Sequence, residues 1–495
     1  MVVIGGSFSG LATLRHLKKH ANVTLVEAKD YFEYTPGVLH LLTGSNAANA
    51  LIVPIEEVSQ GSEHVRGFFE GVKPANKVVL VRALDGVTQK QIDYDVLVIC
   101  TGQSCTHPVG PSRGSLDKRL RLEEVRKFNE KLNVAGKVVM IGGGLVGVEM
   151  AAEIIHRCRT KNVPKVTLIS KSKLLSALPK KAGRYAHSWL TRQGVEIILE
   201  DTLTSIPYSP IASNAKEKLR STNLRTVNGK TIDGVELIID CSNSGVGPFW
   251  NTQDDIYKVG NNVFPDDITT DIESVIWPYN NAGFIEVNEY LQATWDNTIF
   301  AAGDVTELMS GVGLAASTLN SGPYGKKSSK PAVRNAHIAE SQAEVVATNI
   351  KVLLNMKLTN CSPSCTMAKY PKDIFYGAQN VPLVACVSLG PNNGIIVFNE
   401  LVLGGALFGV FGGFLKFAIE RSKIAEIKQR KWGRAMWAFS HVVLNSVHSF
   451  WDKSRGFFGK YRVLRRSVLS TTLVFMITVF LRARFSGNQW ISKYF

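Results

Sequence analysis

The residues best suited to chemistry are the glycines of a turn near position 145. Gly142, Gly144 and Gly147 have the GxGxxG spacing, and they directly follow the apolar run Val138–Ile141. In such a turn the first glycine permits a tight bend, the second lets the backbone approach a pyrophosphate, and the third allows a helix to pack against the strand. Free N–H groups at the helix start, beside Leu145, then face the phosphates. The spacing therefore predicts a dinucleotide site, with a purely structural glycine turn as the alternative.

A second turn of the same kind begins the chain. Residues 2–14 read VVIGGSFSGLATL, with Gly5, Gly6 and Gly10 in the turn and Ser7 at the position of the middle glycine. The Cβ of Ser7 would push a pyrophosphate slightly away, although serine is the least disruptive substitute. Two dinucleotide folds in one chain suggest two dinucleotides, and therefore electron transfer between them.

The residue that ends the second strand of each fold indicates which nucleotide binds. The strand Val23–Val26 ends in Glu27, whose carboxylate would accept the hydroxyls of an adenosine ribose; the alternative is an ordinary surface acid. The strand Val166–Ile169 ends instead in Ser170 and Lys171, with no acid. Because a carboxylate there favours NADH, its absence beside lysines favours NADPH, or the use of both cofactors.

Segments later in the chain are expected to contribute to the dinucleotide site at the first glycine turn. Apolar strands end in Thr101-Gly102 and in Gly303-Asp304, and Asp304 would lie against the ribityl and pyrophosphate groups of a flavin, with a plain turn aspartate as the alternative. The turn at Thr35-Pro36 either faces the flavin or is a plain loop. A helix predicted at Asn335–Ile350 would direct its positive end at the flavin, where negative charge accumulates on reduction.

Length and composition agree with a multidomain globular protein. The chain of 495 residues is long enough for two or three full cores, and 45% of it is hydrophobic and 20% charged. Its seven cysteines are odd in number and irregular in spacing, which indicates a reducing compartment. No pair of thiols follows the first glycine turn, so a dithiol reductase mechanism is excluded. No metal site is predicted, at Cys361 and Cys365 or elsewhere.

These features predict an α/β protein with two Rossmann-like dinucleotide-binding domains, one for FAD and one for NAD(P)H, and a helical C-terminal region that associates with a membrane. The polar stretch from about Gly110 to Lys131 is expected to be a crossover between the two domains. The expected division is 1–110 and 251–355 for the FAD domain, 111–250 for the NAD(P)H domain, 356–434 for a C-terminal domain with a membrane-interface segment, and 435–495 for a membrane-anchoring tail.

The order of the motifs resembles the two-dinucleotide flavoprotein superfamily. The motifs are GGSFSG, Glu27, the TPG turn, Thr101-Gly102, GGGLVGVE and FAAGD. Within that superfamily, the segments YTPG and LGPNNG resemble the ferroptosis suppressor and apoptosis-inducing-factor-like quinone reductases, which are close relatives of the type II NADH dehydrogenases. The resemblance implies non-covalent FAD, hydride transfer from NAD(P)H to the flavin, and delivery of electrons to a quinone. Glu149 matches the family glutamate near the nicotinamide and is the expected catalytic residue. The quinone motif AQxAxQ appears only as the divergent Ala336–Ser341.

The net charge of +16 is concentrated at the C-terminus. Residues 416–495 carry sixteen lysines and arginines against three acids, which leaves the first 415 residues near neutrality. A basic cluster beside apolar segments fits an anionic membrane surface better than DNA. Within it, Arg421 and Lys423 resemble a functional region of the family, but a solvated charge run is the simpler interpretation.

Four C-terminal segments are expected to differ in role. Leu401–Leu415 is too short to span a bilayer and is expected to be buried, with the wall of a quinone tunnel as the alternative. Lys416–Arg434 resembles an interfacial helix, and Ala435–Trp451 has Trp437 and Trp451 near its ends, as interface anchors would. Ser467–Leu481 lies between arginines and is expected to insert into the membrane as a helix, with full spanning left open.

The expected partners are a quinone and, through the C-terminal tail, membrane lipid. No nucleic-acid partner is expected, and a homodimer is left open. The protein is expected at a membrane. A mitochondrial membrane is the preferred location, and another organelle or a lipid droplet is the alternative. A redox-sensing flavoprotein, whose reduction by NAD(P)H switches partners, is the alternative function, and a nucleic-acid-binding protein is a third. Because the cofactor supplies the hydride chemistry, no further acid or base is required for the first half-reaction.

Overall fold

The structure is a computed structural model that describes most of the chain. The residues outside the description are 45–47, 60, 106–107, 113, 158–162, 206–220, 243, 247–274, 281, 310–333, 360–366, 377–380, 391–392, 405 and 458–495. The expected membrane helix at Ser467–Leu481 and the Cys361–Cys365 pair therefore lie outside the described residues.

The first glycine turn belongs to an eight-stranded sheet. Its order is β21-β18-β19-β20-β9-β1-β2-β5, and β5, β2, β1, β9 and β20 are parallel neighbours. The apolar runs of β1 and β9 are buried on both faces, as the central strands of a parallel sheet must be. The strands are β1 Val2–Ile4, β2 Thr24–Val26, β5 Glu63–Val65, β9 Leu97–Ile99, β18 Ile285–Val287, β19 Gln292–Ala293, β20 Asp296–Ala301 and β21 Thr306–Leu308.

The second glycine turn belongs to a separate, four-stranded parallel sheet with the order β13-β12-β11-β16. Its strands are β11 Lys137–Ile141, β12 Lys165–Ser170, β13 Glu196–Leu199 and β16 Leu237–Asp240. The strands β10 (Gln103–Cys105) and β17 (Ser244–Val246) pair antiparallel and run alongside each other between the two sheets. The mixed α/β fold with parallel sheets that the sequence predicted is therefore confirmed.

Antiparallel strands and short hairpins complete the sheets. One three-stranded sheet packs beside the first parallel sheet, and another precedes the C-terminal helices. The strands are β3 Tyr31–Glu33 with β4 Ile52–Pro54, β6 Phe68–Lys73 with β7 Val78–Arg82 and β8 Gln89–Asp93, β14 Thr222–Arg225 with β15 Thr231–Val235, and β22 Val384–Ser388 with β23 Gly394–Phe398 and β24 Leu401–Leu403.

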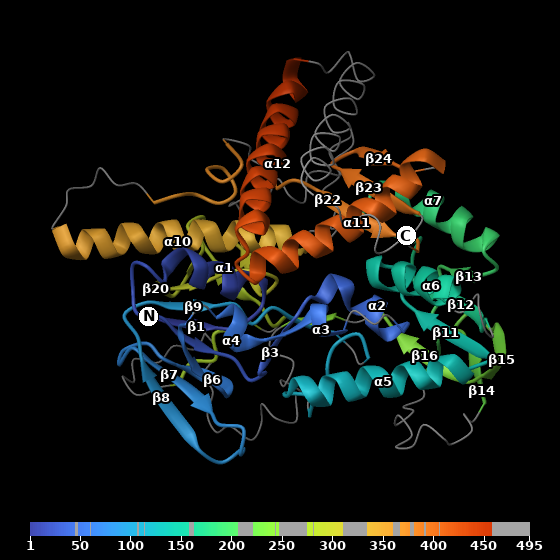
Figure 1. Cartoon of the computed structure of the whole chain (residues 1–495), viewed down its shortest axis with the longest axis horizontal. Helices are drawn as coiled ribbons and strands as arrows, with labels where there is room; N and C mark the ends of the chain where they lie inside the picture. Colours follow the sequence, from blue (N-terminus) through green and yellow to red (C-terminus); the bar gives the residue numbers. More distant parts are fainter. Residues whose placement is uncertain are drawn as a thin grey trace.

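The helices cover the sheets on several sides, and Figure 1 shows α10 lying across α1 while α12 projects from the body. The described helices are α1 Phe8–Leu17, α2 Val38–Leu42, α3 Ala48–Leu51, α4 Ile55–Val58, α5 Lys118–Val134, α6 Leu145–Arg157, α7 Lys180–Arg192, α10 Ala336–Thr359, α11 Ala406–Ile427 and α12 Lys431–Phe457, with a 3₁₀ turn at Thr35–Gly37. The helix predicted from Asn335 is α10, and it extends beyond the predicted end. Asn335 caps it, because its side-chain oxygen accepts the N–H of Ile338 at 3.0 Å.

The segment expected to be a polar crossover is largely the helix α5. The helix buries Val125, Phe128 and Leu132, which recur at intervals of three and four residues. This apolar stripe is hard to recognise in the sequence because most of the residues around it are charged. On its exposed face Arg126 pairs with Glu123 and Glu130 one turn away on either side.

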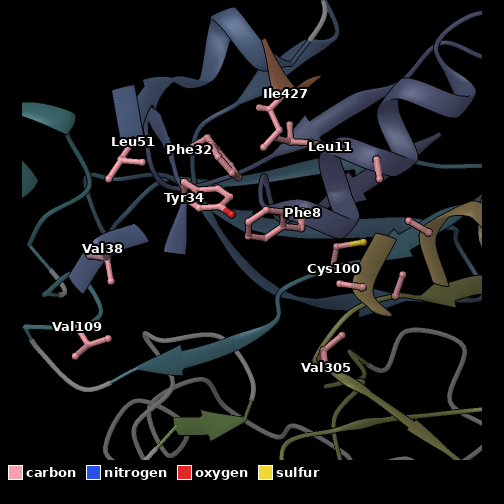
Figure 2. Packing of buried hydrophobic residues seen from close by; sticks show 14 of the residues in the cluster. Phe8, Leu11, Phe32, Tyr34, Val38, Leu51, Cys100, Val109, Val305 and Ile427 are labelled. Carbon is pink, nitrogen blue, oxygen red and sulfur yellow. The ribbon is translucent and has the colours of Figure 1, made fainter. Parts of the chain in front are cut away.

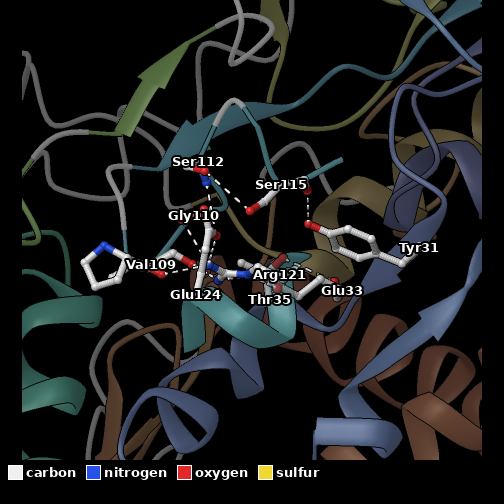
Figure 3. Close-up of polar contacts among 10 residues, drawn as sticks. Tyr31, Glu33, Thr35, Val109, Gly110, Ser112, Ser115, Arg121 and Glu124 are labelled. Atoms are coloured by element: carbon white, nitrogen blue, oxygen red, sulfur yellow. Dashed lines mark hydrogen bonds and ion pairs between the residues drawn. The ribbon is translucent and has the colours of Figure 1, made fainter. Parts of the chain in front are cut away.

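A buried arginine, Arg121, fixes α5 to the first half of the molecule. Its Nε donates to Glu33 Oε2 at 2.7 Å, and its other nitrogens donate to Glu124 and to the carbonyls of residues 108–110. The side chain is fully buried, and Figure 3 shows it held between β3 and the start of the crossover. Glu33 is two residues before Thr35, so this contact also holds the turn at Thr35–Gly37.

The C-terminal helices differ from the expected membrane-interface pattern. The second half of α11 is buried from Ser422 to Ile427, and Trp437 of α12 is half-buried. The exposed large apolar residues of α12 are Trp432, Phe439 and Val442. Among the helices within the described ranges, none has the length and apolar character needed to cross a membrane.

Replacing Arg121 with methionine should destabilise the protein by about 3–5 kcal/mol, because it leaves the Glu33 carboxylate and several carbonyls buried without their donor. Arg126→Met, on the exposed face of the same helix, should change stability little. Thermal unfolding of both variants measures the difference. Equal losses in the two variants would contradict the structural role given to Arg121.

Candidate functional site

The carboxyl ends of four parallel strands meet at one edge of the first sheet. Ile4 of β1 pairs with Ile99 of β9 and with Val26 of β2, and Ile99 pairs with Ala301 of β20. The residues that follow these four strands are therefore neighbours. This register brings together Gly5, Glu27, Thr101-Gly102 and Gly303-Asp304, which the sequence assigned to one cofactor site.

The first glycine turn is as tight as its spacing predicts. A Cβ on Gly10 would lie 1.8 Å from the carbonyl oxygen of Gly5, and a Cβ on Gly5 would lie 2.4 Å from the carbonyl oxygen of Cys100. Gly5 also has a φ of +100°, which favours glycine. Ser7 is extended and half-buried, and its hydroxyl makes no capping hydrogen bond to α1.

Glu27 supports this turn directly. Its buried carboxylate accepts the N–H of Gly6 at 2.7 Å through Oε2 and the N–H of Lys29 at 3.0 Å through Oε1. Each carboxylate oxygen can accept more than one hydrogen bond, so the ribose role predicted for Glu27 is compatible with these contacts.

Aromatic side chains line the same part of the molecule. Phe8 of α1 packs edge-on against Phe32 and Tyr34, with ring centroids 5.4 and 5.9 Å apart, and Figure 2 shows the three rings together. The exposed residues Thr35 and Pro36 follow Tyr34 immediately. The hydroxyl of Thr35 donates to the carbonyl oxygen of Glu33 at 3.4 Å, which is a local hydrogen bond.

On the opposite side of the edge, Gly303 and Asp304 are held by α10. The N–H of Gly303 donates to the Gln342 side chain at 2.7 Å. Burial raises the pKa of Asp304, and the nearby Arg334 opposes that change. The hydroxyls of Thr101 and Tyr279 hydrogen bond at 2.8 Å, while Gly102 has open space beside it.

The second glycine turn has the same geometry as the first. A Cβ on Gly147 would lie 1.9 Å from the carbonyl oxygen of Gly142, and Gly142 has a φ of +106°. By contrast, a Cβ on Gly144 would meet no atom of the described residues within 4 Å. Open space beside the middle glycine is what a bound pyrophosphate requires.

The two residues predicted to select NADPH are placed differently. Ser170 is buried, and its Oγ would lie 2.5 Å from a Cβ on Gly143, so it packs beneath the glycine turn. Lys171 is exposed at the end of β12. Of the two, Lys171 is the residue whose side chain lies outside the core.

Glu149 joins the second site to the C-terminal helices. It lies in the second turn of α6, and its buried carboxylate accepts the N–H of Ser388 at 2.7 Å. The same oxygen forms a short ion pair with Lys416 of α11. The predicted catalytic glutamate is therefore paired with a lysine that the sequence analysis did not single out.

One helical turn further along α6, Glu153 makes an equivalent contact with α2. His40 lies 3.3 Å from Glu153 and, through its other ring nitrogen, 3.3 Å from Glu420 of α11. Burial alone would lower the pKa of His40, but the hydrogen bonds and charges of the two carboxylates raise it to about 9. His40 is therefore a cation at neutral pH that joins three parts of the chain.

The prediction that Lys423 is a solvated charge is wrong. Its side chain is 3% exposed and forms ion pairs with Glu340 of α10, at 2.5 Å, and with Glu426. Arg15 of α1 also pairs with Glu426, and the ring of Trp437 lies 4.5 Å from the Lys423 ammonium. Arg421 is exposed, as expected for a solvated charge.

Two histidines lie beside this cluster. Both ring nitrogens of His337 are shielded from solvent and have no hydrogen-bond partner in the described part of the chain, and burial lowers its pKa. The ring of His441 is 4.9 Å away. Burial, with the charges of Lys423 and Arg15, lowers the pKa of His441 to about 3, so both rings are neutral.

A sequence signal for these missed residues exists in α11. Lys416, Glu420, Lys423 and Glu426 recur at intervals of three and four, and small or apolar residues separate most of them. This spacing places the charges along one stripe of the helix. Glu149 and Glu153 on α6 are also four residues apart. The sequence therefore contains a charged stripe on each of these two helices, and a pairing between the stripes could have been predicted.

Residues 1–243 match the family model described as pyridine nucleotide-disulphide oxidoreductase. Apoptosis-inducing factor homolog A of Dictyostelium discoideum is 24% identical over 81% of this chain and 85% of that protein. Ferroptosis suppressor protein 1 of Xenopus tropicalis is 23% identical over 82% of this chain and 90% of that protein. The external alternative NAD(P)H-ubiquinone oxidoreductase B3, mitochondrial, of Arabidopsis thaliana is 24% identical over 44% of each. The resemblance that the motifs predicted is confirmed.

Solved structures share the fold. The sulfide:quinone oxidoreductase from Aquifex aeolicus has a TM-score of 0.60 at 19% identity, over 86% of this chain and 91% of that one. NDH2 from Plasmodium falciparum in complex with NADH has a TM-score of 0.59 at 14% identity, over 87% of this chain and 99% of that one.

The two glycines of the second turn should respond differently to alanine. Gly144→Ala should leave the unfolding temperature unchanged but weaken NADH binding by about tenfold or more, because its Cβ enters the space expected for the pyrophosphate. Gly147→Ala should destabilise the protein, because its Cβ would overlap the Gly142 carbonyl. Thermal unfolding with and without NADH distinguishes them, and unchanged NADH binding in Gly144→Ala would contradict the site.

His40 should make stability depend on pH. Its pKa rises from about 6.5 in the unfolded chain to about 9 in the folded one, so the protonated ring stabilises the fold fully below pH 6.5. That contribution, of order 3 kcal/mol, is lost as the pH rises from 6.5 through 9. Unfolding of the wild type and of His40→Gln across this range measures it, and a constant difference between the two would rule it out.

Proposed function

We propose that this chain, whose residues 1–243 match the family model described as pyridine nucleotide-disulphide oxidoreductase, is an FAD-dependent oxidoreductase that passes electrons from NAD(P)H to a quinone at a membrane. The observation that carries the proposal is the presence of two glycine turns, each at the carboxyl edge of its own parallel sheet, in one chain. The named relatives include an NAD(P)H-ubiquinone oxidoreductase, which supports the same reaction.

FAD is proposed to bind at the edge of the first sheet. Gly5, Gly6, Ser7 and Gly10 would hold its pyrophosphate at the start of α1, and Glu27 its ribose. The remaining contacts are proposed for Thr35, Pro36, Thr101, Gly102, Gly303 and Asp304. When bound, FAD supplies the hydride and electron chemistry, and the protein supplies position and electrostatics.

NAD(P)H is proposed to bind at the edge of the second sheet. Gly142, Gly144, Leu145 and Gly147 would hold the pyrophosphate, with open space beside Gly144 to receive it. Lys171 is the residue available for a 2′-phosphate, whereas Ser170 shapes the turn from below.

Glu149 is proposed to position the nicotinamide through its fixed orientation. The Ser388 N–H and the Lys416 ammonium hold the carboxylate on both sides. The same ion pair fixes α11 beside the second site, so the C-terminal helices and the dinucleotide keep a constant relation.

The quinone is proposed to approach between α10 and the C-terminal helices. Among the buried polar atoms without a hydrogen-bond partner in the described residues are the ring nitrogens of His337 on α10 and Nε1 of Trp437 on α12. A quinone has two carbonyl oxygens that accept hydrogen bonds, so a ring N–H of His337 or the indole N–H is a suitable donor.

Membrane attachment is proposed through α12 together with the basic tail. Trp432, Phe439 and Val442 are each about half exposed on α12, and Lys431 and Arg434 lie at its start. Apolar side chains beside cations are typical of an interfacial helix. A mitochondrial membrane is the proposed location because the Arabidopsis relative is mitochondrial by name.

Stopped-flow absorbance of the purified full chain tests this function. Mixing with NADH or NADPH should bleach the oxidised flavin, and a short-chain ubiquinone should restore it rapidly. Glu149→Gln should slow bleaching by roughly 10- to 100-fold, since the nicotinamide is then less well positioned, whereas Glu286→Gln, at an exposed position on β18, should stay close to the wild type. Bleaching that no quinone reverses would favour a redox sensor, and the absence of bound flavin would end the proposal.

A further inference from the structure

A basic groove runs between α7 and β24. It has a volume of about 840 Å³. We call it the α7 groove, and its lining residues are Lys181, Arg184, Tyr185, His187, Ser188, Thr191, Arg192, Val402 and Gly404.

All the charge in the α7 groove has one sign. Lys181, Arg184 and Arg192 are exposed cations, and no carboxylate is among the lining residues. In the described part of the chain, no ion pair links any of the three to an acid. Arg192 makes a hydrogen bond to the Ser188 carbonyl oxygen, which leaves the rest of its guanidinium available.

The sequence of α7 explains why its cations gather on one side. The helix carries four lysines and arginines, one histidine and no acid, while Ala182, Ala186 and Leu190 are fully buried. Lys181, Arg184 and Ser188 recur at intervals of three and four residues, so they share the face opposite the buried one. Lys181 also lies in the first turn of a 13-residue helix, where the helix dipole adds positive potential.

The walls of the α7 groove are fixed by contacts across it. The hydroxyl of Tyr185 donates to the Asn393 side chain at 3.1 Å, which ties α7 to the turn between β22 and β23. A Cβ on Gly404 would lie 3.4 Å from the ring of Tyr185, so the backbone after β24 passes close to that ring. A preformed groove loses little entropy when it binds a ligand.

We propose that the α7 groove binds the phosphate headgroup of an anionic phospholipid. Three exposed cations, with no ion pair to an acid among the described residues, match a phosphodiester together with the hydroxyls of serine and threonine between them. The tail of this chain is an unsuitable occupant, because residues 458–495 contain seven lysines and arginines and no acid. The groove opens beside the C-terminal strands, and Figure 1 shows α7 and β24 in the upper part of the molecule, from which α12 projects.

This inference rests on the membrane attachment proposed above and adds a lipid preference to it. The apolar face of α12 would bind any bilayer, while the α7 groove would select anionic headgroups. The two contributions can therefore be separated by lipid composition.

Flotation of the full chain on vesicles tests the inference. Vesicles of phosphatidylcholine alone are compared with vesicles that contain phosphatidylglycerol, for Lys181→Gln/Arg184→Gln and for a control, Lys90→Gln/Arg119→Gln, which removes two exposed cations elsewhere. The groove variant should bind phosphatidylglycerol vesicles roughly 30-fold more weakly, the scale expected for two cations at an anionic surface. The control should bind as the wild type does, and thermal unfolding confirms that both variants fold.

Several outcomes would overturn the inference. Equal losses in both double variants would indicate diffuse attraction, and no loss in the groove variant would show that the groove binds no headgroup. Inorganic phosphate that displaces the protein at constant ionic strength would assign the groove to free phosphate. A higher KM for NADPH but not for NADH in the groove variant would assign its cations to the nucleotide.

The failure of the proposed function has a different signature. Wild-type protein with bound flavin and quinone turnover in detergent, but without phosphatidylglycerol preference, would overturn only the lipid inference. Phe439→Ser on α12 should weaken binding to both kinds of vesicle equally. Wild-type protein without flavin would overturn the proposed function whatever the vesicles show.

Discussion

The buried charges of α11 are the constraint on which the arrangement of the molecule depends. Lys416 pairs with Glu149 of α6, Glu420 with His40 of α2, and Lys423 with Glu340 of α10. A buried charge that loses its partner costs about 3–5 kcal/mol. Since these partners come from three different helices, α11 has one position in which Lys416, Glu420 and Lys423 are all paired, and that position joins both parallel sheets to the C-terminal region.

The candidate cofactor sites themselves depend on the two parallel sheets. The first sheet gathers Gly5, Glu27, Thr101 and Gly303 at one edge because its strands are parallel and in register. The second sheet repeats the glycine turn. A pair of dinucleotide folds does not by itself fix the position of the C-terminal helices, and the ion pair between Glu149 and Lys416 joins α11 to the second fold.

Much of this could be predicted from the sequence, because local rules determine it. The glycine spacings, the apolar strands and the cap of α10 at Asn335 depend on neighbouring residues alone. The helix α5 and the burial of Lys423 could not be predicted in the same way. In α5 the charges on the exposed face concealed a short apolar stripe, and Lys423 is buried only because Glu340, 83 residues earlier, meets it. Charges are usually solvated, and only their tertiary partners decide otherwise.

The central claim is that electrons from NAD(P)H leave the protein on a quinone. The most direct measurement is an anaerobic assay of the purified full chain that counts NADH oxidised and quinol formed. One quinol should form for each NADH over many turnovers. Oxidation of a single equivalent of NADH per protein, with no quinol formed, would contradict it and would leave a flavoprotein that stores electrons without delivering them.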